Sequence, residues 1–569
     1  MNKLRLILIS VICLLGCKKE RLDEKKDNRF ITENKALSTT RIVNLSMYNQ
    51  VVANGDTLTK YILRLGDEAQ RYIPTLYFPK DGILGTIWQV PQDLFRANGI
   101  AQMDFNDGIT RLKLPVTEKY GRPTDYYLLT DSLAGQPRIE GQPAYVAVER
   151  GVGQPSKPDH FKIRILNLSA RSKVQIDGDQ LESLEGPVSL AYADGSLVAP
   201  QTTNVTAAQR LSDYIELPYG SYQFRVLTPD GRQLPGSAPV NTNNKIIYPS
   251  NSTISTRTTN SFESAMLTFA PVASYQPGGV YTIVIAPYNF SYYDGIYEKK
   301  GALQNGFRVI TDVNPGVNNT YYRLQGVNAL PGSSNLGFRI NGKALASGIS
   351  YGQSSDYGRL IQGMASIEAV DASGKVLATL TGQVLRPGQN YSAWLYPDQQ
   401  GGAKLTLVAN DLSGFDAGTP SPDGGAQNGL ANDFMFNKRF LNLSPDNPYI
   451  TFTFDNGQLD FNQKATVNLQ PGLPITEMPY IISARPGYNK TFQIMAYRSS
   501  PAVVPGSWAE DIVVLKNTAF VADELLYMSA GRDVPIQEPG IYTVALIGRT
   551  GNGVTEANKA KLIIVKHNR

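Results

Sequence analysis

The sequence predicts an all-β protein built of tandem β-sandwich modules. Three observations support this fold class: a composition rich in turn-forming residues, a segment that recurs at intervals the size of a small domain, and Asn-Gly or Asp-Gly dipeptides between short apolar runs. Such dipeptides supply the positive φ angles of tight hairpin turns, and alternation of apolar and polar residues is typical of half-buried strands.

Length and composition exclude several classes of protein. The chain has 569 residues, which at about 150 residues per domain indicates about four domains. It contains 51 glycines and 35 prolines, with 42% hydrophobic and 18% charged residues, which is typical of a globular β-rich protein. The net charge of +5 is too small to indicate nucleic acid binding. Two histidines and two cysteines leave little material for imidazole or thiolate chemistry, so we predict no metal and no cofactor.

The N-terminus carries a secretory signal. Lys3 and Arg5 precede an apolar run that ends in Leu-Leu-Gly-Cys, with the cysteine at position 17. A charged start followed by a short apolar run is typical of a signal peptide, and this run is too short to span a bilayer. The Leu-Leu-Gly-Cys sequence resembles the bacterial lipobox. We therefore expect residues 1–16 to be a lipoprotein signal peptide and Cys17 to be lipidated.

Residues 17–37 are expected to form a lipidated tether, because they mix charges with few apolar side chains. Acyl chains on Cys17, such as palmitate, would hold the protein at the outer membrane. The tether resembles those of Bacteroidota lipoproteins, in which an acidic cluster after the cysteine directs export to the cell surface. Glu20, Asp23 and Glu24 match this cluster in part, since basic residues lie among them. The sequence therefore favours the cell surface modestly over the periplasmic face.

Internal repetition divides the rest of the chain. The segment Arg-Ile-Val-Asn-Leu-Ser begins at Arg41, returns in related form at Arg164 and Arg439, and has a degenerate copy at Arg323. The copies lie about 120 to 160 residues apart, which is the size of a small β-sandwich and not of a solenoid repeat.

Each copy continues with the same local signals. Hairpin turns are predicted at Asn54-Gly55, Asp177-Gly178, Asn341-Gly342 and Asn456-Gly457. Three copies also contain a Pro-Gly turn that leads into a strand with a tyrosine predicted to lie in the core, at Tyr281, Tyr391 and Tyr542. The predicted modules are residues 38–157, 158–315, 316–413 and 437–569, and the Gly- and Pro-rich residues 414–436 are a predicted linker.

These repeated features resemble an uncharacterised immunoglobulin-like repeat domain of secreted and lipid-anchored bacterial proteins, especially those of Bacteroidota. The resemblance is best over residues 160–315 and 320–412, fair over 437–567 and weakest over 38–150, where the terminal turn does not match. It implies tandem immunoglobulin-like sandwiches. It implies no activity, because this domain of unknown function has none assigned.

Motifs that could carry catalysis lack their usual context. Residues 348–352 fit the G-x-S-x-G pattern of a nucleophile elbow, which requires a strand-to-helix turn and a histidine base. No helical periodicity follows, and the downstream histidine, His567, is expected at a frayed C-terminus. His160 is expected to be an exposed residue between modules, and the acidic segments at Asp104 and Asp177 lack EF-hand spacing. We predict no catalytic residue, and nothing in the sequence supports a pair of carboxylates for glycoside hydrolysis.

An aromatic insertion is the most distinctive local feature. It lies between the strand at 281–285 and the closing strand at 306–309, and its aromatic residues are Tyr288, Phe290, Tyr292, Tyr293 and Tyr297. Aromatic residues in loops on rigid β scaffolds suit binding of a sugar or a protein. The alternative is that these rings cover their own sandwich or a neighbouring module.

Two further groups of residues have weaker signals. The tryptophans at positions 88, 394 and 508 are predicted to be core or half-buried strand residues. Asp56-Thr57-Leu58 and Asp131-Ser132-Leu133 resemble the acceptor sequence of O-glycosylation in Bacteroidota, which would place Thr57 and Ser132 on the surface.

The sequence thus predicts a non-catalytic, lipid-anchored cell-envelope protein that presents β-sandwich modules for surface interaction or adhesion to a protein partner. The alternative is a glycan-binding accessory lipoprotein for polysaccharide capture. A hydrolase would require acidic residues clustered in a cleft.

Overall fold

The computed structural model describes residues 36–46, 48–60, 74–130, 139, 141–174, 181–237, 267–294, 298–412, 436–460, 462–482, 491–528, 534–535 and 537–569. Strands hold 49% and helices 5% of the residues, so the predicted all-β sandwich fold is confirmed. The predicted signal peptide, Cys17, most of the tether and residues 413–435 of the linker region lie outside the described residues.

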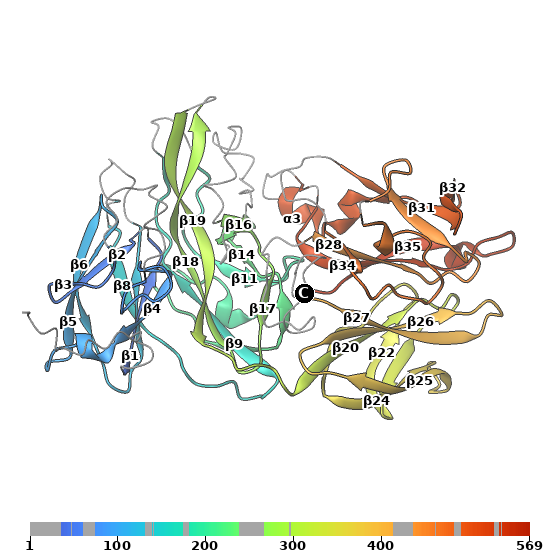
Figure 1. Cartoon of the computed structure of the whole chain (residues 1–569), viewed down its shortest axis with the longest axis horizontal. Coiled ribbons are helices and arrows are strands. Elements are labelled where there is room, and N and C mark those ends of the chain that lie inside the picture. The colour runs from blue at the N-terminus through green and yellow to red at the C-terminus, as the bar shows by residue number, and fades with distance from the viewer. Residues whose placement is uncertain are drawn as a thin grey trace, which may run out of the picture. The chain divides into compact units, whose positions relative to one another are not determined.

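Pairing of the described strands is confined to four successive stretches of the chain, at residues 37–149, 160–313, 321–410 and 436–566, which we call sandwiches 1 to 4 (Figure 1). By its internal contacts the chain divides into two compact units. One contains residues 1–128 and 145–149, and the other contains residues 129–144 and 150–569. Sandwiches 2, 3 and 4 therefore belong to one unit.

Sandwich 1 has two four-stranded sheets. The first has the order β4 (Ile87–Pro91), β1 (Leu37–Asn44), β7 (Thr124–Leu128) and β8 (Tyr145–Glu149). The second has the order β3 (Asp56–Thr57), β2 (Gln50–Ala53), β5 (Ile100–Asn106) and β6 (Arg111–Thr117). Alternate residues of β6 are buried, as expected for a strand with one face on the core.

Sandwich 2 is the least regular. Its largest sheet has the order β12 (Ile215–Pro218), β9 (His160–Asn167), β18 (Val280–Asp294), β19 (Glu298–Val313), β15 (Pro235–Ser237) and β16 (Leu267–Phe269), and β10 (Lys173–Val174) also pairs with β19. Two small sheets join β11 (Ser189–Ala191) to β14 (Arg225–Leu227) and β13 (Gly220–Tyr222) to β17 (Ala273–Tyr275).

Sandwich 3 has the strand order of sandwich 1. Its first sheet is β23 (Gly358–Ile361), β20 (Tyr321–Asn328), β26 (Asn390–Pro397) and β27 (Ala403–Asn410). Its second sheet is β22 (Lys343–Ile349), β21 (Leu336–Ile340), β24 (Gly363–Val370) and β25 (Val376–Leu385).

Sandwich 4 pairs β30 (Tyr480–Ile482), β28 (Phe436–Asn442), β34 (Gly540–Ile547) and β35 (Lys561–Lys566) in one sheet. The other sheet contains β29 (Ile450–Phe454), β31 (Gln493–Ser500) and β32 (Val503–Trp508), with β33 (Leu515–Lys516) on β31. Sandwich 4 also contains the short helix α3 (Glu524–Met528). Short 3-10 turns occur in sandwiches 1, 2 and 4, at Gln92–Leu94, Pro200–Thr202, Gln463–Ala465, Asn517–Phe520 and Glu556–Asn558.

One sheet recurs in all four sandwiches, and we call it the main sheet. It consists of the strands β4-β1-β7-β8, β12-β9-β18-β19, β23-β20-β26-β27 and β30-β28-β34-β35. In each main sheet the two central strands run parallel and both flanking strands run antiparallel to them. Sandwich 1, which has the weakest sequence resemblance, therefore shares the arrangement of the others.

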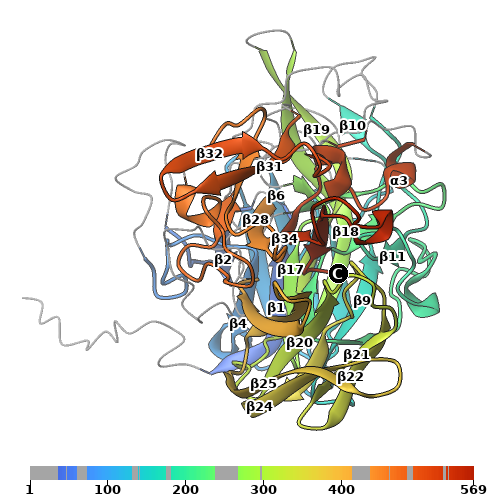
Figure 2. The same ribbon diagram turned by 90° about the vertical axis from the view of Figure 1, so that its right-hand side faces the viewer.

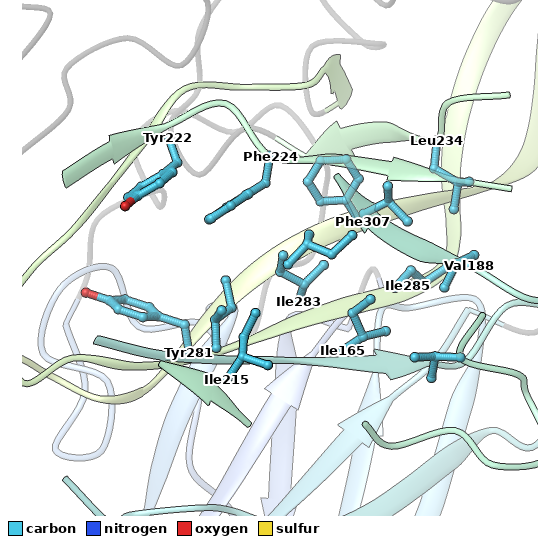
Figure 3. Packing of buried hydrophobic residues seen from close by; sticks show 14 of the residues in the cluster. Ile165, Val188, Ile215, Tyr222, Phe224, Leu234, Tyr281, Ile283, Ile285 and Phe307 are labelled. Carbon is cyan, nitrogen blue, oxygen red and sulfur yellow. The ribbon is translucent and has the colours of Figure 1, made fainter. Parts of the chain in front are cut away.

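The core of sandwich 2 shows how the layers pack. Tyr222 and Phe224 lie on one side and face Ile165, Ile215 and Tyr281 on the other (Figure 3). The rings of Tyr222 and Phe224 are stacked with centroids 4.8 Å apart. Burial of such large apolar side chains, each worth about 1.5–3 kcal/mol, holds the two layers together.

The predicted turns are present where the structure describes them. Asn54 and Gly55 have φ angles of 53° and 103°, and Asn341 and Gly342 have 48° and 77°, so both hairpins use two left-handed residues. Asn456-Gly457 also has positive φ, whereas Asp177-Gly178 lies outside the described residues.

A buried tyrosine recurs in the second central strand of each main sheet. Its hydroxyl bonds to backbone a few residues upstream: Tyr126 to Thr117, Tyr281 to Gln276, Tyr391 to Arg386 and Tyr542 to Glu538. This is the geometry of the tyrosine corner of immunoglobulin-like sandwiches. Sandwich 1 has it without the Pro-Gly turn, because Tyr126 reaches back across a longer connection.

The asparagine of the repeated segment closes the loop after the first strand of each main sheet. The side-chain oxygen of Asn44, Asn167, Asn328 and Asn442 accepts from the backbone N–H two residues later, at 3.0 to 3.2 Å. Each side-chain amide also donates to backbone carbonyls of neighbouring segments. The recurrence of this asparagine is therefore explained by its hydrogen bonds, which close the loop after the strand.

Candidate functional site

The arginine that opens each repeat is buried on the face of the main sheet opposite the sandwich core. In sandwich 2, for example, Ile163 and Ile165 belong to the core, and Arg164 between them points to the other face. The guanidinium carbons of Arg164, Arg323 and Arg439 lie over the rings of Tyr214, Tyr357 and Tyr480, at 4.5, 4.6 and 4.8 Å from the ring centres. In sandwich 1, Arg41 instead forms a buried bidentate pair with Asp125, with N–O distances of 2.9 and 2.5 Å.

Sandwiches 2, 3 and 4 meet at a region that we call the junction. Its apolar part lies between the outer faces of the main sheets of sandwiches 3 and 4. Trp394, Val327 and Val408 of sandwich 3 pack there against Leu441 and Ala545 of sandwich 4. Trp394 is fully buried, so the prediction of a buried strand residue is confirmed, but the ring packs between sandwiches.

His567 lies in the polar part of the junction, and the expectation that it belongs to a frayed end is wrong. Its side chain is buried, with Nδ1 2.8 Å from the hydroxyl of Tyr357 and Nε2 2.8 Å from that of Thr543. Burial, together with the charges of Arg439 and Arg323, lowers the pKa of His567 to about 3. The imidazole is therefore neutral, and both of its nitrogens are hydrogen-bonded.

A buried ion pair joins sandwiches 2 and 4 in the same region. The Arg225 guanidinium lies 2.6 Å from Glu538 and 3.0 Å from the hydroxyl of Tyr527, and both charged side chains are almost completely buried. Although burial alone would lower the pKa of Arg225, Tyr527 and Glu538 raise it above its ordinary value. Lys566 donates to Gln223, and burial lowers its pKa to about 8.

The last residues of the chain complete the junction. Arg569 exchanges backbone hydrogen bonds with Ser221 and Gln223 of sandwich 2, at 3.0 and 2.7 Å. In both views the C-terminus lies close to β17 and β34 (Figures 1 and 2). Sandwich 3 is tied to sandwich 2 by Arg359 and Asp159, whose side chains are 2.6 Å apart.

The junction is thus a closed structural network. His160, expected to be exposed, is buried, and its Nδ1 lies 2.7 Å from Asp159. This contact joins His160 to the Arg359 ion pair. The histidine, arginine and carboxylate side chains of the junction form hydrogen bonds and ion pairs with one another. These contacts stabilise the packing of sandwiches 2, 3 and 4.

A cavity of about 400 Å³ lies elsewhere in the second compact unit. It is lined by Leu129, Gln142 and Pro143, and by Asn167, Leu168 and Arg171 at the end of β9 and in the loop that follows. Glu185, Ala207 and Arg210 also line it. This volume is within the roughly 300–1,000 Å³ that is typical of small-molecule sites.

The G-x-S-x-G segment is not a nucleophile elbow in this structure. It spans the end of β22 and a turn in which Gly348 and Gly352 have φ angles of 74° and 82°. The next described element is the strand β23, and His567 is bonded to other residues. The acidic segment at Asp104 is also structural, because Asp104 pairs with Arg111 and Asp107 closes the β5–β6 turn. No metal-binding cluster occurs among the described residues.

The aromatic segment expected to be a loop is mostly strand. Residues up to Asp294 continue β18 and pair with β19, so that Tyr288 faces Gln304 and Tyr293 faces Lys299 in register. Aromatic residues favour strands, which explains the extension. Tyr288 is buried against Arg308, with burial raising its pKa to about 12. The backbones of Phe290, Tyr292 and Tyr293 lie in β18, and Tyr297 lies outside the described residues.

The other candidate residues have varied surroundings. Thr57 is exposed on β3, as glycosylation requires, and Ser132 lies outside the described residues. Trp88 is buried, as predicted, whereas Trp508 on β32 is 45% exposed.

Sequence reasoning missed the junction ion pairs and the cavity. Arg225, Glu538 and Asp159 are far apart in the chain and belong to no repeated motif. The one available signal was a charged residue within an apolar strand, at Arg225.

No protein-family model matches the chain, and a comparison with curated proteins finds no significant match. The resemblance to immunoglobulin-like bacterial repeats stays an interpretation of the repeated residues. No helix in the described part of the chain has the length and apolar character to cross a membrane.

Proposed function

We propose that the chain is a non-catalytic, lipid-anchored protein of the bacterial outer membrane that presents a rigid set of immunoglobulin-like sandwiches for interaction with a partner protein. The observation that carries this proposal is the junction, which holds sandwiches 2, 3 and 4 in one compact unit. Apolar contacts join sandwiches 3 and 4, and the Arg225–Glu538 and Arg359–Asp159 ion pairs join sandwich 2 to both. Rigid β scaffolds with connecting loops are a common architecture for binding surfaces.

Three features support the individual parts of the proposal. The Leu-Leu-Gly-Cys sequence at Cys17 supports lipidation and secretion. The tyrosine corner in every sandwich supports an immunoglobulin-like origin. His567 is the histidine that a serine hydrolase with the G-x-S-x-G segment would need as its base. Its hydrogen bonds within the junction support a structural role for it instead.

The second candidate function is glycan capture, and the cavity favours it. An aromatic platform at the β18–β19 hairpin has less support, since the ring of Tyr288 is covered. Arginine and carboxamide groups around a cavity of this size are suited to a polar small ligand.

The two functions are separated by one comparison. Cells that carry the full protein, and cells that carry Cys17→Ala, are tested for attachment to a panel of extracellular matrix proteins, and protease treatment of intact cells reports surface exposure. Attachment by the first cells alone, without glycan binding on an array, supports the interaction role. Glycan binding without attachment supports capture, and protection from protease would place the protein on the periplasmic face.

A further inference from the structure

The walls of the cavity carry opposite charges at separate positions. Arg171 and Arg210 line it from two loops of sandwich 2, and Glu185 lines it from a third. All three side chains are exposed, and none takes part in an ion pair or side-chain hydrogen bond within the described part of the chain. Two guanidinium groups and one carboxylate are therefore available to a ligand.

The remaining wall is apolar. Leu129 and Leu168 are buried and line the cavity, together with Pro143 and Ala207. The carbon-bearing face of a sugar ring suits such a surface, while its hydroxyls meet the polar groups around it.

We propose that this cavity binds a short saccharide that bears one or two carboxylate or sulfate groups. Arg171 and Arg210 recognise the anionic group, because guanidinium pairs with carboxylate or sulfate in a charge-assisted geometry. Glu185 accepts from a sugar hydroxyl and disfavours a polyanionic ligand such as an acidic peptide. This inference rests on the glycan-capture function and adds its site and its ligand class.

The test uses the chain from Lys18 onward, which contains every described residue, and isothermal titration calorimetry. The probes are digalacturonate, the neutral galactobiose, sodium sulfate and a poly-glutamate peptide. We expect digalacturonate to bind, and Arg171→Ala with Arg210→Ala to weaken it at least about tenfold, the loss typical of a hydrogen bond to a charged group.

Arg386→Ala removes an exposed arginine of sandwich 3 and is the matched control, with no expected change. Unchanged melting temperatures establish that the variants fold. Equal binding of galactobiose and digalacturonate would overturn the proposal, and so would stronger binding of the peptide or of sulfate alone. Saccharide binding that the cavity variants retain would overturn the site but leave glycan capture standing, whereas a blank glycan array would remove both.

Discussion

Replacing Glu538 by glutamine removes the negative charge that faces Arg225. The substitution keeps the shape of the side chain and one acceptor oxygen. Arg225 is 0% exposed and Glu538 is 1% exposed, so water cannot take the place of the lost charge. The positive charge of Arg225 stays buried between sandwiches 2 and 4, with the Tyr527 hydroxyl and neutral groups as its partners.

The size of the effect follows from this burial. Removal of one partner of a buried ion pair costs about 3–5 kcal/mol, because the other charge is left uncompensated. The amide oxygen of glutamine retains a hydrogen bond to Arg225, so we expect a loss of about 3 kcal/mol of unfolding free energy. Arg498 and Asp511 form a matched pair on the surface, at 2.7 Å with side chains 39% and 49% exposed. Asp511→Asn is expected to cost less than about 1 kcal/mol.

Urea denaturation of the chain from Lys18 onward, followed by tryptophan fluorescence and circular dichroism, measures both changes. The double variant Arg225→Met with Glu538→Met serves as a second control, because an apolar pair in place of a buried ion pair is often neutral or stabilising. We expect it to recover part of the loss, because Ala193, Gln233 and Lys566 also lose a partner. Equal free energies for Glu538→Gln and Asp511→Asn would refute the assignment of this ion pair to the stability of the junction.

Three further outcomes are expected. The pKa of His567 is about 3 in the folded state and near 6.5 in the unfolded state. Between these pH values the unfolded chain binds more protons than the folded chain. The free energy of unfolding therefore falls as the pH drops below about 6.5, by up to about 1.4 kcal/mol per pH unit. Urea denaturation at pH 7 and 4.5 should show a smaller fall for His567→Gln. Asn328→Ala leaves a backbone donor and backbone acceptors without partners and should lower the free energy of unfolding by about 2 kcal/mol or more. Asn319→Ala, at an exposed position, should lower it little, and calorimetry measures both changes. Mass spectrometry of the protein from its native host should show loss of one glycan mass in Thr57→Ala, and an unchanged mass would contradict glycosylation there.

Local features of this fold were predictable from the sequence. The Asn341-Gly342 turn depends on the φ angles of two residues, which the residue types themselves favour. The repeated Asn328 was visible as a pattern, but its role needs carbonyls of residues up to 21 positions away. The Pro-Gly turn before Tyr391 indicated the strand of Trp394, but the residues that cover the ring come from sandwich 4.

Long-range features were not predictable. The burial of His567 depends on Tyr357, which lies 210 residues earlier in the chain. Its position near the end of the chain therefore did not predict its exposure. The β18–β19 hairpin was expected to contain a loop because the equivalent hairpin of sandwich 3 is short. Pairing of both strands beyond Tyr288 required the three-dimensional register.

The parallel central pair of the main sheet fixes the route of the chain through each sandwich. In sandwich 3, Arg323 near the start of β20 pairs with Asn390, which in turn pairs with Asn410 at the end of β27. The chain thus enters and leaves the main sheet at one end, and the same holds where Phe436 pairs with Gly540 and Tyr542 pairs with Lys566. In modules of this kind the first and last strands of the main sheet therefore connect to the rest of the chain at the same end, and not at opposite ends. In sandwich 2 the same end of the main sheet holds Lys162, Val280 and Val313, which pair across β9, β18 and β19.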